Sequence, residues 1–127
     1  MKKFILLSIA ILTFNMVSIA QTQTPEQRAK AQTEKMTTEL NLSTSQVASV
    51  YEVNYGIILK NEAMRNATYT EDVKKQAIQQ NNEARKSMLK SILTVDQYRL
   101  FEQKLEEKKQ IKKQVRQKVK KEKQKKD

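Results

Sequence analysis

The chain has 127 residues, a formal net charge of +11, one glycine, one proline, and neither cysteine nor histidine. It can therefore hold no disulfide, and it lacks the ligands on which most zinc, copper and nickel sites depend. The scarcity of turn-forming residues disfavours a sheet protein and favours an all-α fold. The charge is uneven: residues 21–103 hold 11 basic and 10 acidic side chains, whereas residues 104–127 hold 12 and 4.

The N-terminal segment is typical of a cleaved secretory signal peptide. Two lysines precede an apolar run over residues 4–14, and the segment ends in Ser18-Ile19-Ala20. This run of 11 residues is shorter than the ~20 residues that span a bilayer. We therefore expect residues 1–20 to be a signal peptide cleaved after Ala20, with an uncleaved anchor as the alternative. The mature chain would be soluble.

The first helix is predicted to begin after Thr24, which suits the N-cap, with Pro25 at N1 and Gln27 completing a capping box. We expect it to run to Leu40 and to end at a left-handed Asn41. Its predicted buried positions are Ala29, Met36 and Leu40.

The second helix is predicted from Leu42 to the polar stretch 66–70, with two asparagines, Asn54 and Asn61, breaking its apolar spacing. The third is expected to start near Thr68 or Thr70 and to run to about Ile92. The apolar positions of the second helix are Val47, Val50, Tyr51, Ile57, Ile58 and Met64. Those of the third are Val73, Ala77, Ala84, Met88 and Ile92.

The fourth helix is predicted to begin at the segment 93–97 and to continue into the lysine-rich C-terminus, where its last turns should fray. Its apolar stripe becomes thinner along the chain. The stripe consists of Tyr98, Phe101, Leu105, Ile111, Val115 and Val119.

Two segments 51 residues apart share one pattern: a leucine, a hydroxyl residue, two variable residues and a glutamine. The hydroxyl can accept a hydrogen bond from the N3 amide, and the glutamine can reach back to the N-cap amide. The leucine can pack against Val47 or Tyr98 at position N4. The pattern therefore predicts a repeated helix-turn-helix plan. The motif residues are Leu42, Ser43 and Gln46, and Leu93, Thr94 and Gln97.

This Leu-Thr-x-x-Gln pattern, present twice in a small exported helical chain, resembles the Spy/CpxP family of periplasmic proteins. The second copy matches fully, and the first keeps the hydroxyl with Ser43 in place of threonine. The resemblance covers residues 25–120. It implies a four-helix, hook-like subunit that pairs into a curved homodimer in the periplasm. It also implies ATP-independent chaperone activity or envelope-stress signalling, although here the positive charge lies after Lys104 rather than over the cradle.

The components of a catalytic or metal site are nearly absent. A single glycine excludes a glycine-rich phosphate loop, and the carboxylate pairs Glu71-Asp72 and Glu106-Glu107 are sequence neighbours rather than converging groups. No acidic loop has the spacing of a calcium site. We therefore predict no enzyme activity, no catalytic residue, no metal site and no cofactor.

The basic segment 104–127 forms a second candidate functional element. It lacks the interleaved aromatic residues that stack on bases, so we do not expect nucleic acid as a partner. Anionic lipid, lipopolysaccharide or acidic unfolded proteins fit an exported chain better, and a solvated helix end that adds solubility is the simpler alternative. The candidate binding residues are Lys108, Lys109, Lys112, Lys113, Arg116, Lys120 and Lys121.

We thus expect a signal peptide (1–20), a helical body (21–103) and a basic tail (104–127). The body has few large apolar residues for four helices, which favours self-association. The first functional hypothesis is a chaperone or envelope-stress accessory protein that captures partly unfolded chains. The alternative is an envelope adaptor that binds anionic surfaces through the tail.

Overall fold

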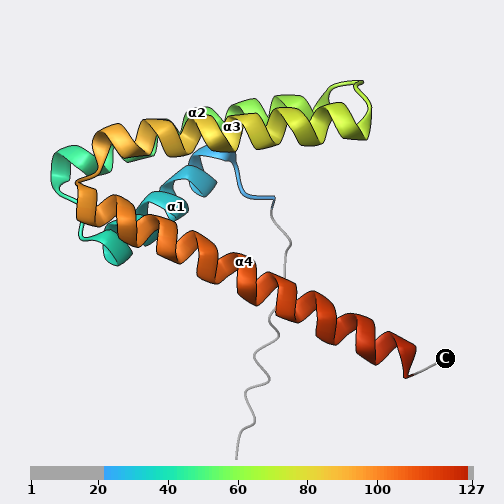
Figure 1. The fold of residues 1–127 in the computed structure, drawn as a ribbon. Coiled ribbons are helices and arrows are strands. Elements are labelled where there is room, and N and C mark those ends of the chain that lie inside the picture. Colours follow the sequence, from blue (N-terminus) through green and yellow to red (C-terminus); the bar gives the residue numbers. More distant parts are fainter. Residues whose placement is uncertain (1–21, 126–127) are drawn as a thin grey trace, which may run out of the picture.

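The computed structural model describes residues 22–125, which form four α-helices and no strand (Figure 1). The all-α prediction is confirmed. The expected signal peptide and its cleavage site lie outside the described residues. The helices are α1 (Pro25–Leu40), α2 (Thr44–Asn66), α3 (Glu71–Ile92) and α4 (Val95–Gln124).

A hydroxyl side chain begins every one of these helices. Each accepts a hydrogen bond from the amide three residues onward, and three of the four ends are complete capping boxes, the exception being α3. α1 ends as predicted at Asn41, whose backbone is left-handed at φ 53°. The N-caps are Thr24, Ser43, Thr70 and Thr94. Capping chemistry therefore located the helix starts correctly.

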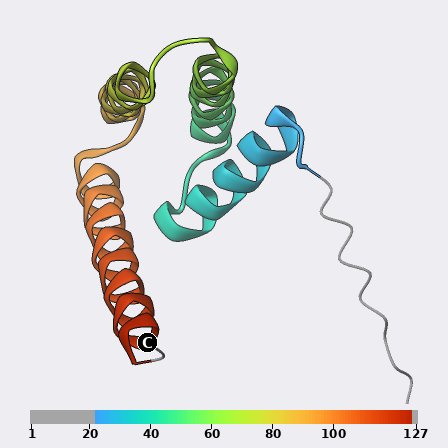
Figure 2. The same ribbon diagram turned by 90° about the vertical axis from the view of Figure 1, so that its right-hand side faces the viewer.

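Helices α2 and α3 form a long antiparallel hairpin, and α1 and α4 lie on the same side of it (Figures 1 and 2). α1 lies beneath α2 and crosses it obliquely (Figure 2). α4 starts beneath the end of α3 and then diverges from it, so its C-terminal half stands away from the rest of the chain. The core consequently sits where the start of α4 meets the other three helices.

The core is an apolar cluster at the end of the molecule where the α1–α2 and α3–α4 turns lie, called here the closed end. Both motif leucines belong to it, so the turns are fixed by burial as well as by caps. Val47 and Tyr98, the expected partners of those leucines, pack against the cluster. Its buried members are Met36, Leu40, Leu42, Val50, Leu89, Leu93 and Phe101.

The apolar side expected for the third helix differs from its buried side at three positions. Val73, Ala84 and Met88 are exposed, and Leu89 is fully buried instead. The prediction followed the apolar and small residues. The real inward face also contains Arg85, because that residue bonds a buried asparagine on α2.

Helix α4 packs against the body only through its first turns. Phe101 is buried and Leu105 partly so, but every residue from Glu106 to Lys125 is exposed, including the expected apolar positions Ile111, Val115 and Val119. The structure describes a continuous helix to Gln124, so fraying stays a prediction about solution behaviour. Within residues 22–125, no helix is both long and apolar enough to cross a membrane.

Candidate functional site

The two sequence motifs, far apart in the chain, meet at the closed end of the molecule. The Nε2 of Gln46 donates to the Oε1 of Gln97 at 2.6 Å, and the Nε2 of Gln97 donates back to the Oε1 of Gln46 at 3.1 Å. Each Oε1 also accepts the amide of its own N-cap residue at 3.0 Å, from Ser43 and Thr94 respectively. The predicted capping boxes are thus joined into one reciprocal pair.

Each glutamine also reaches the helix that precedes the other motif. Gln46 Nε2 donates to the carbonyl of Ile92 at the end of α3, at 3.2 Å. Gln97 Nε2 donates to the carbonyls of Leu40 and Asn41 at the end of α1, at 3.2 and 3.4 Å. Helix ends leave such carbonyls without intrahelical partners. The pair therefore links four helix termini through two side chains, which is a structural role.

A second polar cluster, which the sequence analysis missed, lies inside the helical body. Asn54 is fully buried on α2; its Nδ2 donates to the hydroxyl of Thr33 on α1 at 3.0 Å. Its Oδ1 accepts from the Nε of Arg85 on α3 at 2.9 Å. Asn61 likewise accepts a bond from Asn81, at 3.0 Å. The asparagines that interrupt the apolar spacing of α2 therefore bond polar residues of neighbouring helices.

Arg85 is the partly buried cation of this cluster. Its guanidinium lies 5.6 Å from the centre of the Phe101 ring and donates to the Met36 sulfur at 3.4 Å. Burial lowers the pKa of Arg85, although an arginine stays charged at neutral pH. Its protein partners are a neutral amide, a thioether and an aromatic face. No carboxylate of residues 22–125 forms an ion pair with it.

Arg85 opens onto a cleft enclosed by all four helices, beneath the α2–α3 hairpin and between α1 and α4. The cleft measures roughly 250 Å³. Its floor is apolar, with contributions from Met36, Ile57, Ile58, Phe101 and Leu105. Its rim carries Lys35, Lys104 and Lys108 and a single acidic residue, Glu39. Glu39 is 3.8 Å from Lys35 and so is already paired.

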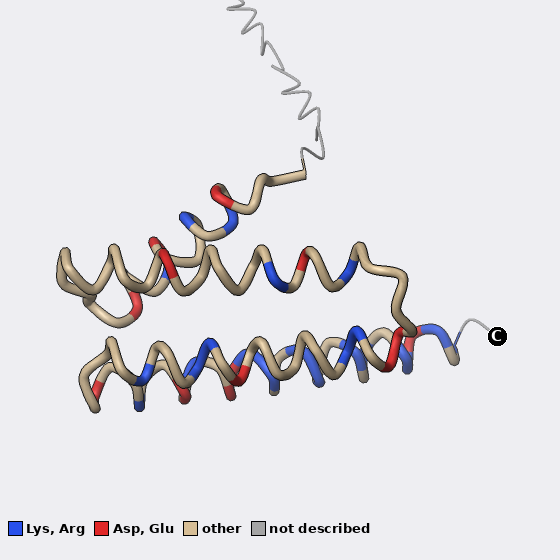
Figure 3. The backbone as a smooth tube through the Cα atoms, turned by 90° about the horizontal axis from the view of Figure 1, so that it is seen from above, with Lys and Arg blue, Asp and Glu red and all other residues tan. Residues whose placement is uncertain are grey.

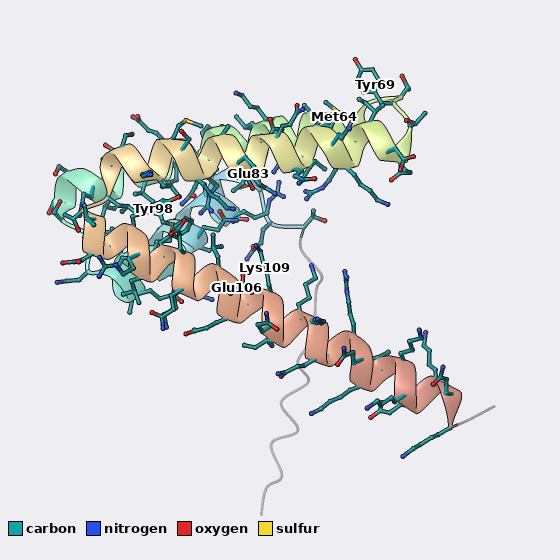
Figure 4. The ribbon with its side chains drawn as sticks, in the orientation of Figure 1. Met64, Tyr69, Glu83, Tyr98, Glu106 and Lys109 are labelled. Carbon is teal, nitrogen blue, oxygen red and sulfur yellow. The ribbon has the colours of Figure 1, made fainter. Side chains whose placement is uncertain are left out.

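A wider hollow of roughly 590 Å³ adjoins this cleft between α3 and α4, and the two share Asn82, Arg85 and Leu105. Its one acidic residue, Glu83, is paired with Lys86 at 3.1 Å. Figure 4 shows Glu83 on α3 and Lys109 on α4 at opposite sides of this opening. The cationic groups around it are Lys75, Arg85, Lys86 and Lys109.

The seven basic residues predicted as a binding surface divide into two groups. Lys108 and Lys109 line the two hollows just described. The others lie farther along α4, where Figure 3 shows lysine and arginine repeating toward the C-terminal end. A shallow hollow of roughly 380 Å³ on the helix is lined by Lys112, Lys113, Arg116 and Lys120 and also by Lys109, which thus borders both groups; Lys121 is exposed. In residues 22–125, no hydrogen bond or ion pair joins these seven to the motif residues.

In the described part of the chain, no group of three or more His, Cys, Asp or Glu residues could hold a metal ion. Glu26 accepts a hydrogen bond from the Tyr55 hydroxyl at 3.0 Å. Backbone and side-chain hydrogen bonds lower the pKa of Glu26, and the bond to that carboxylate raises the pKa of Tyr55. Glu26 is exposed, Tyr55 is half-buried, and neither lines one of the hollows described here, so the pair fastens α1 to α2.

Comparison with known protein families gives one match. Residues 18–101 match the family described as "Domain of unknown function (DUF4890)", and the chain belongs to this family. The match spans α1, α2, α3 and the start of α4, and therefore includes both glutamine motifs. No curated protein and no solved structure matches the chain.

Proposed function

We propose that this DUF4890 protein is an exported, ATP-independent chaperone or envelope-stress accessory protein that binds partly unfolded polypeptides in the periplasm. In this proposal it is Spy/CpxP-like, with a hook-like subunit that pairs into a curved homodimer. It acts without a cofactor: exposed apolar side chains hold the client, and positive charge speeds the encounter.

The observation that carries this proposal is the reciprocal pairing of Gln46 and Gln97. The glutamines belong to the two motifs on which the resemblance to the Spy/CpxP family rests. Their pairing supports one shared structural role for the motifs rather than two chance capping sequences.

The surface also supports capture of unfolded chains. Large apolar side chains are exposed on three helices and in the α2–α3 turn, beside abundant lysine. A client can therefore find both apolar contacts and positive charge on the exposed residues of these helices. These exposed residues are Leu59, Tyr69, Val73, Met88, Val95, Ile111, Val115 and Val119.

An aggregation-suppression assay tests the proposal. The mature protein, at stoichiometric excess, is mixed with a chemically denatured client that scatters light as it aggregates. We expect delayed and reduced scattering without ATP. An inert basic protein of similar size serves as the control for charge alone. Unchanged scattering at every ratio would contradict chaperone activity.

A variant truncated after Gln110 separates the body from the tail. It keeps Lys104 and Leu105, which are partly buried, and removes residues 111–127, which hold nine basic and two acidic side chains. A chaperone that captures clients on its body should keep most of its suppression and lose mainly association rate toward acidic clients. Complete loss of aggregation suppression in this variant would indicate that clients bind the removed tail rather than the body.

The second candidate function is an envelope adaptor that binds an anionic surface through α4. It is favoured by the projection of the lysine-rich half of α4 away from the body (Figure 1). Such binding should weaken as salt rises, because the Debye length is about 10 Å at 0.1 M salt. Cosedimentation with anionic vesicles measures it. The adaptor proposal requires salt-sensitive binding that disappears when residues 111–127 are removed.

A further inference from the structure

The cleft beneath the α2–α3 hairpin places a partly buried arginine beside apolar side chains, which suits an anionic group attached to an apolar one. A partly buried arginine has neutral protein partners at its guanidinium. Charges removed from water are ordinarily paired with an opposite charge. Both acidic residues that line the two hollows, Glu39 and Glu83, already face a lysine. Two of the lining lysines, Lys104 and Lys109, are also 3.9 Å from Glu107 and Glu106, so the surplus positive charge of the cleft rests on Arg85 and Lys108.

We propose that this cleft binds a carboxylate of a polypeptide, with Arg85 as the anchor and Lys108 and Lys109 at the entrance. The proposal rests on the chaperone function above and deepens it by naming the chemical class recognised: an extended segment that carries Asp or Glu next to apolar residues. A guanidinium offers parallel N–H donors that match the two oxygens of a carboxylate. Here the Nε of Arg85 is held by Asn54, which orients the group.

The shape of the cleft favours a peptide over a membrane. Residues of all four helices line it, and Arg85 is partly buried where the cleft meets the adjoining hollow, so the flat phosphate layer of a bilayer reaches the guanidinium less readily than an extended peptide does. The apolar floor, which includes Phe101 and Leu105, suits aliphatic or aromatic side chains beside the carboxylate. A lone inorganic anion would leave this floor uncovered.

The ligand would not need to disturb the core. Arg85 is already stacked on Phe101 and bonded to Asn54, and both interactions can persist while the remaining N–H groups meet a carboxylate. Lys108 lies on the cleft and Lys109 on the adjoining hollow, and both are exposed. Their charges can therefore attract an acidic segment before it reaches Arg85.

The test uses the full mature chain and a blocked hexapeptide that alternates leucine and glutamate, with a leucine–glutamine peptide as the neutral probe. Binding is measured by fluorescence anisotropy and by NMR of the arginine guanidinium groups. We expect the acidic peptide to bind and to shift the Arg85 resonances, and the neutral peptide to bind at least about tenfold more weakly.

Two pairs of substitutions on the same helix provide a matched comparison. Lys108→Gln with Lys109→Gln removes two charges at the cleft, and Lys120→Gln with Lys121→Gln removes two charges farther along α4. We expect the first pair to weaken peptide binding about fivefold and the second to leave it unchanged. Equal weakening by both pairs would overturn the proposal, because it would mean that net charge alone attracts the peptide.

Arg85→Lys tests the anchor while keeping its charge. We expect about a tenfold loss of peptide affinity, since lysine cannot form the paired hydrogen bonds. The lysine pair above keeps the proposal testable if this variant fails to fold. Unchanged Arg85 resonances on saturation with peptide would overturn the assignment, as would equal binding of inorganic phosphate at the same resonances. Anionic vesicles that displace the peptide would also overturn it.

The outcomes distinguish this site from the chaperone proposal. If the protein suppresses aggregation and the lysine pair at the cleft has no effect on peptide binding, the function stands and the carboxylate site fails. If the peptide binds at Arg85 but no client is protected from aggregation, the site stands and the chaperone function fails.

Discussion

At the scale of single residues, amide side chains form the hydrogen bonds that join separate helices of this molecule. Gln46 and Gln97 each accept an N-cap amide and donate to the other glutamine. Asn54 uses both ends of its side chain inside the body, toward Thr33 and Arg85. A neutral amide carries a donor and an acceptor, so it can satisfy two helices at once without burying a charge.

Removing either glutamine should destabilise the fold by about 1–2 kcal/mol, because a cap and the partner's hydrogen bond are lost together. We expect the Gln46→Ala and Gln97→Ala effects to be non-additive, with a coupling of about 1 kcal/mol in a double-mutant cycle. Urea unfolding of the three variants measures this. Gln114→Ala, at an exposed position of α4, is the control. Strictly additive effects would mean that the two motifs act independently.

Replacing Asn54 with leucine should cost about 3 kcal/mol, because Arg85 and Thr33 lose their partner inside the body. Asn54→Asp should cost less, since its carboxylate can pair with the guanidinium. Thermal unfolding of both variants checks the order. If the leucine variant were as stable as the natural protein, Arg85 would have to reach solvent at no cost in the free energy of unfolding.

At the scale of elements, the α1–α2 and α3–α4 turns each combine a hydroxyl cap with a buried leucine, whereas the α2–α3 turn has the cap of Thr70 alone. The cap alone is a local device, but Leu42 and Leu93 also enter the core cluster with Phe101. The caps therefore fix the residue at which each helix begins. The buried leucines fix the direction in which that helix runs from the turn. α3 illustrates the second effect, since the burial of Leu89 and the bond of Arg85 decide which face turns inward.

Leu93→Ala should destabilise the protein by about 3 kcal/mol, because it leaves a cavity in the core. Thr94→Ala and Ser43→Ala should cost about 1 kcal/mol each, the usual value of an N-cap. Val95 is 77% exposed, so Val95→Ala serves as the neighbouring control, with a change within about 0.5 kcal/mol. Chemical unfolding gives all four values. Equal costs for Leu93 and Val95 would contradict the burial of the motif leucine.

At the scale of the whole molecule, the position where the chain becomes strongly basic differs from the position where α4 stops packing against the other helices. Charge rises from Lys104 onward, but Lys104 and Leu105 are still partly buried, and full exposure begins at Glu106. The far half of α4 therefore packs against no other part of residues 22–125. Isolated helices shorter than about 12–15 residues are marginal in water, so this half depends on its own sequence to stay helical.

Truncation after Gln110 should change the free energy of unfolding by less than about 0.5 kcal/mol, because it removes only exposed turns. For the same reason, amides of residues 111–124 should exchange with deuterium much faster than those of the first turns of α4. Mass-resolved hydrogen exchange measures the second effect. Slow exchange over 111–124 would instead indicate a partner that covers this half of the helix, such as a second copy.

The protein recovered from an exporting cell should begin at Gln21, because the N-terminal segment has the three-part pattern of a cleaved signal. Intact-mass measurement of the secreted fraction checks this. Substituting Ala20 with a bulky residue should block processing and provides the control. Recovery of the unprocessed chain from a membrane fraction would support the anchor alternative instead.

The sequence by itself determined the all-α fold, the helix starts and the two motif turns. Caps and staples are local interactions, made within about five residues, so they can be read without knowledge of the fold. The burial of Ala29, Met36 and Leu40 on α1 was predicted correctly for a related reason, since that short helix has one apolar stripe.

Only the tertiary structure decided which polar residues turn inward. From the spacing of apolar residues alone, Asn54 reads as an interruption of an apolar helix face, and Arg85 cannot be told from the other basic residues of the body. Their burial depends on partners 21 and 31 residues away from Asn54, and no local pattern encodes such a contact. The pairing of Gln46 with Gln97 and the cleft at Arg85 likewise depend on how separate helices pack together, because neighbouring helices, not neighbouring residues, provide their partners.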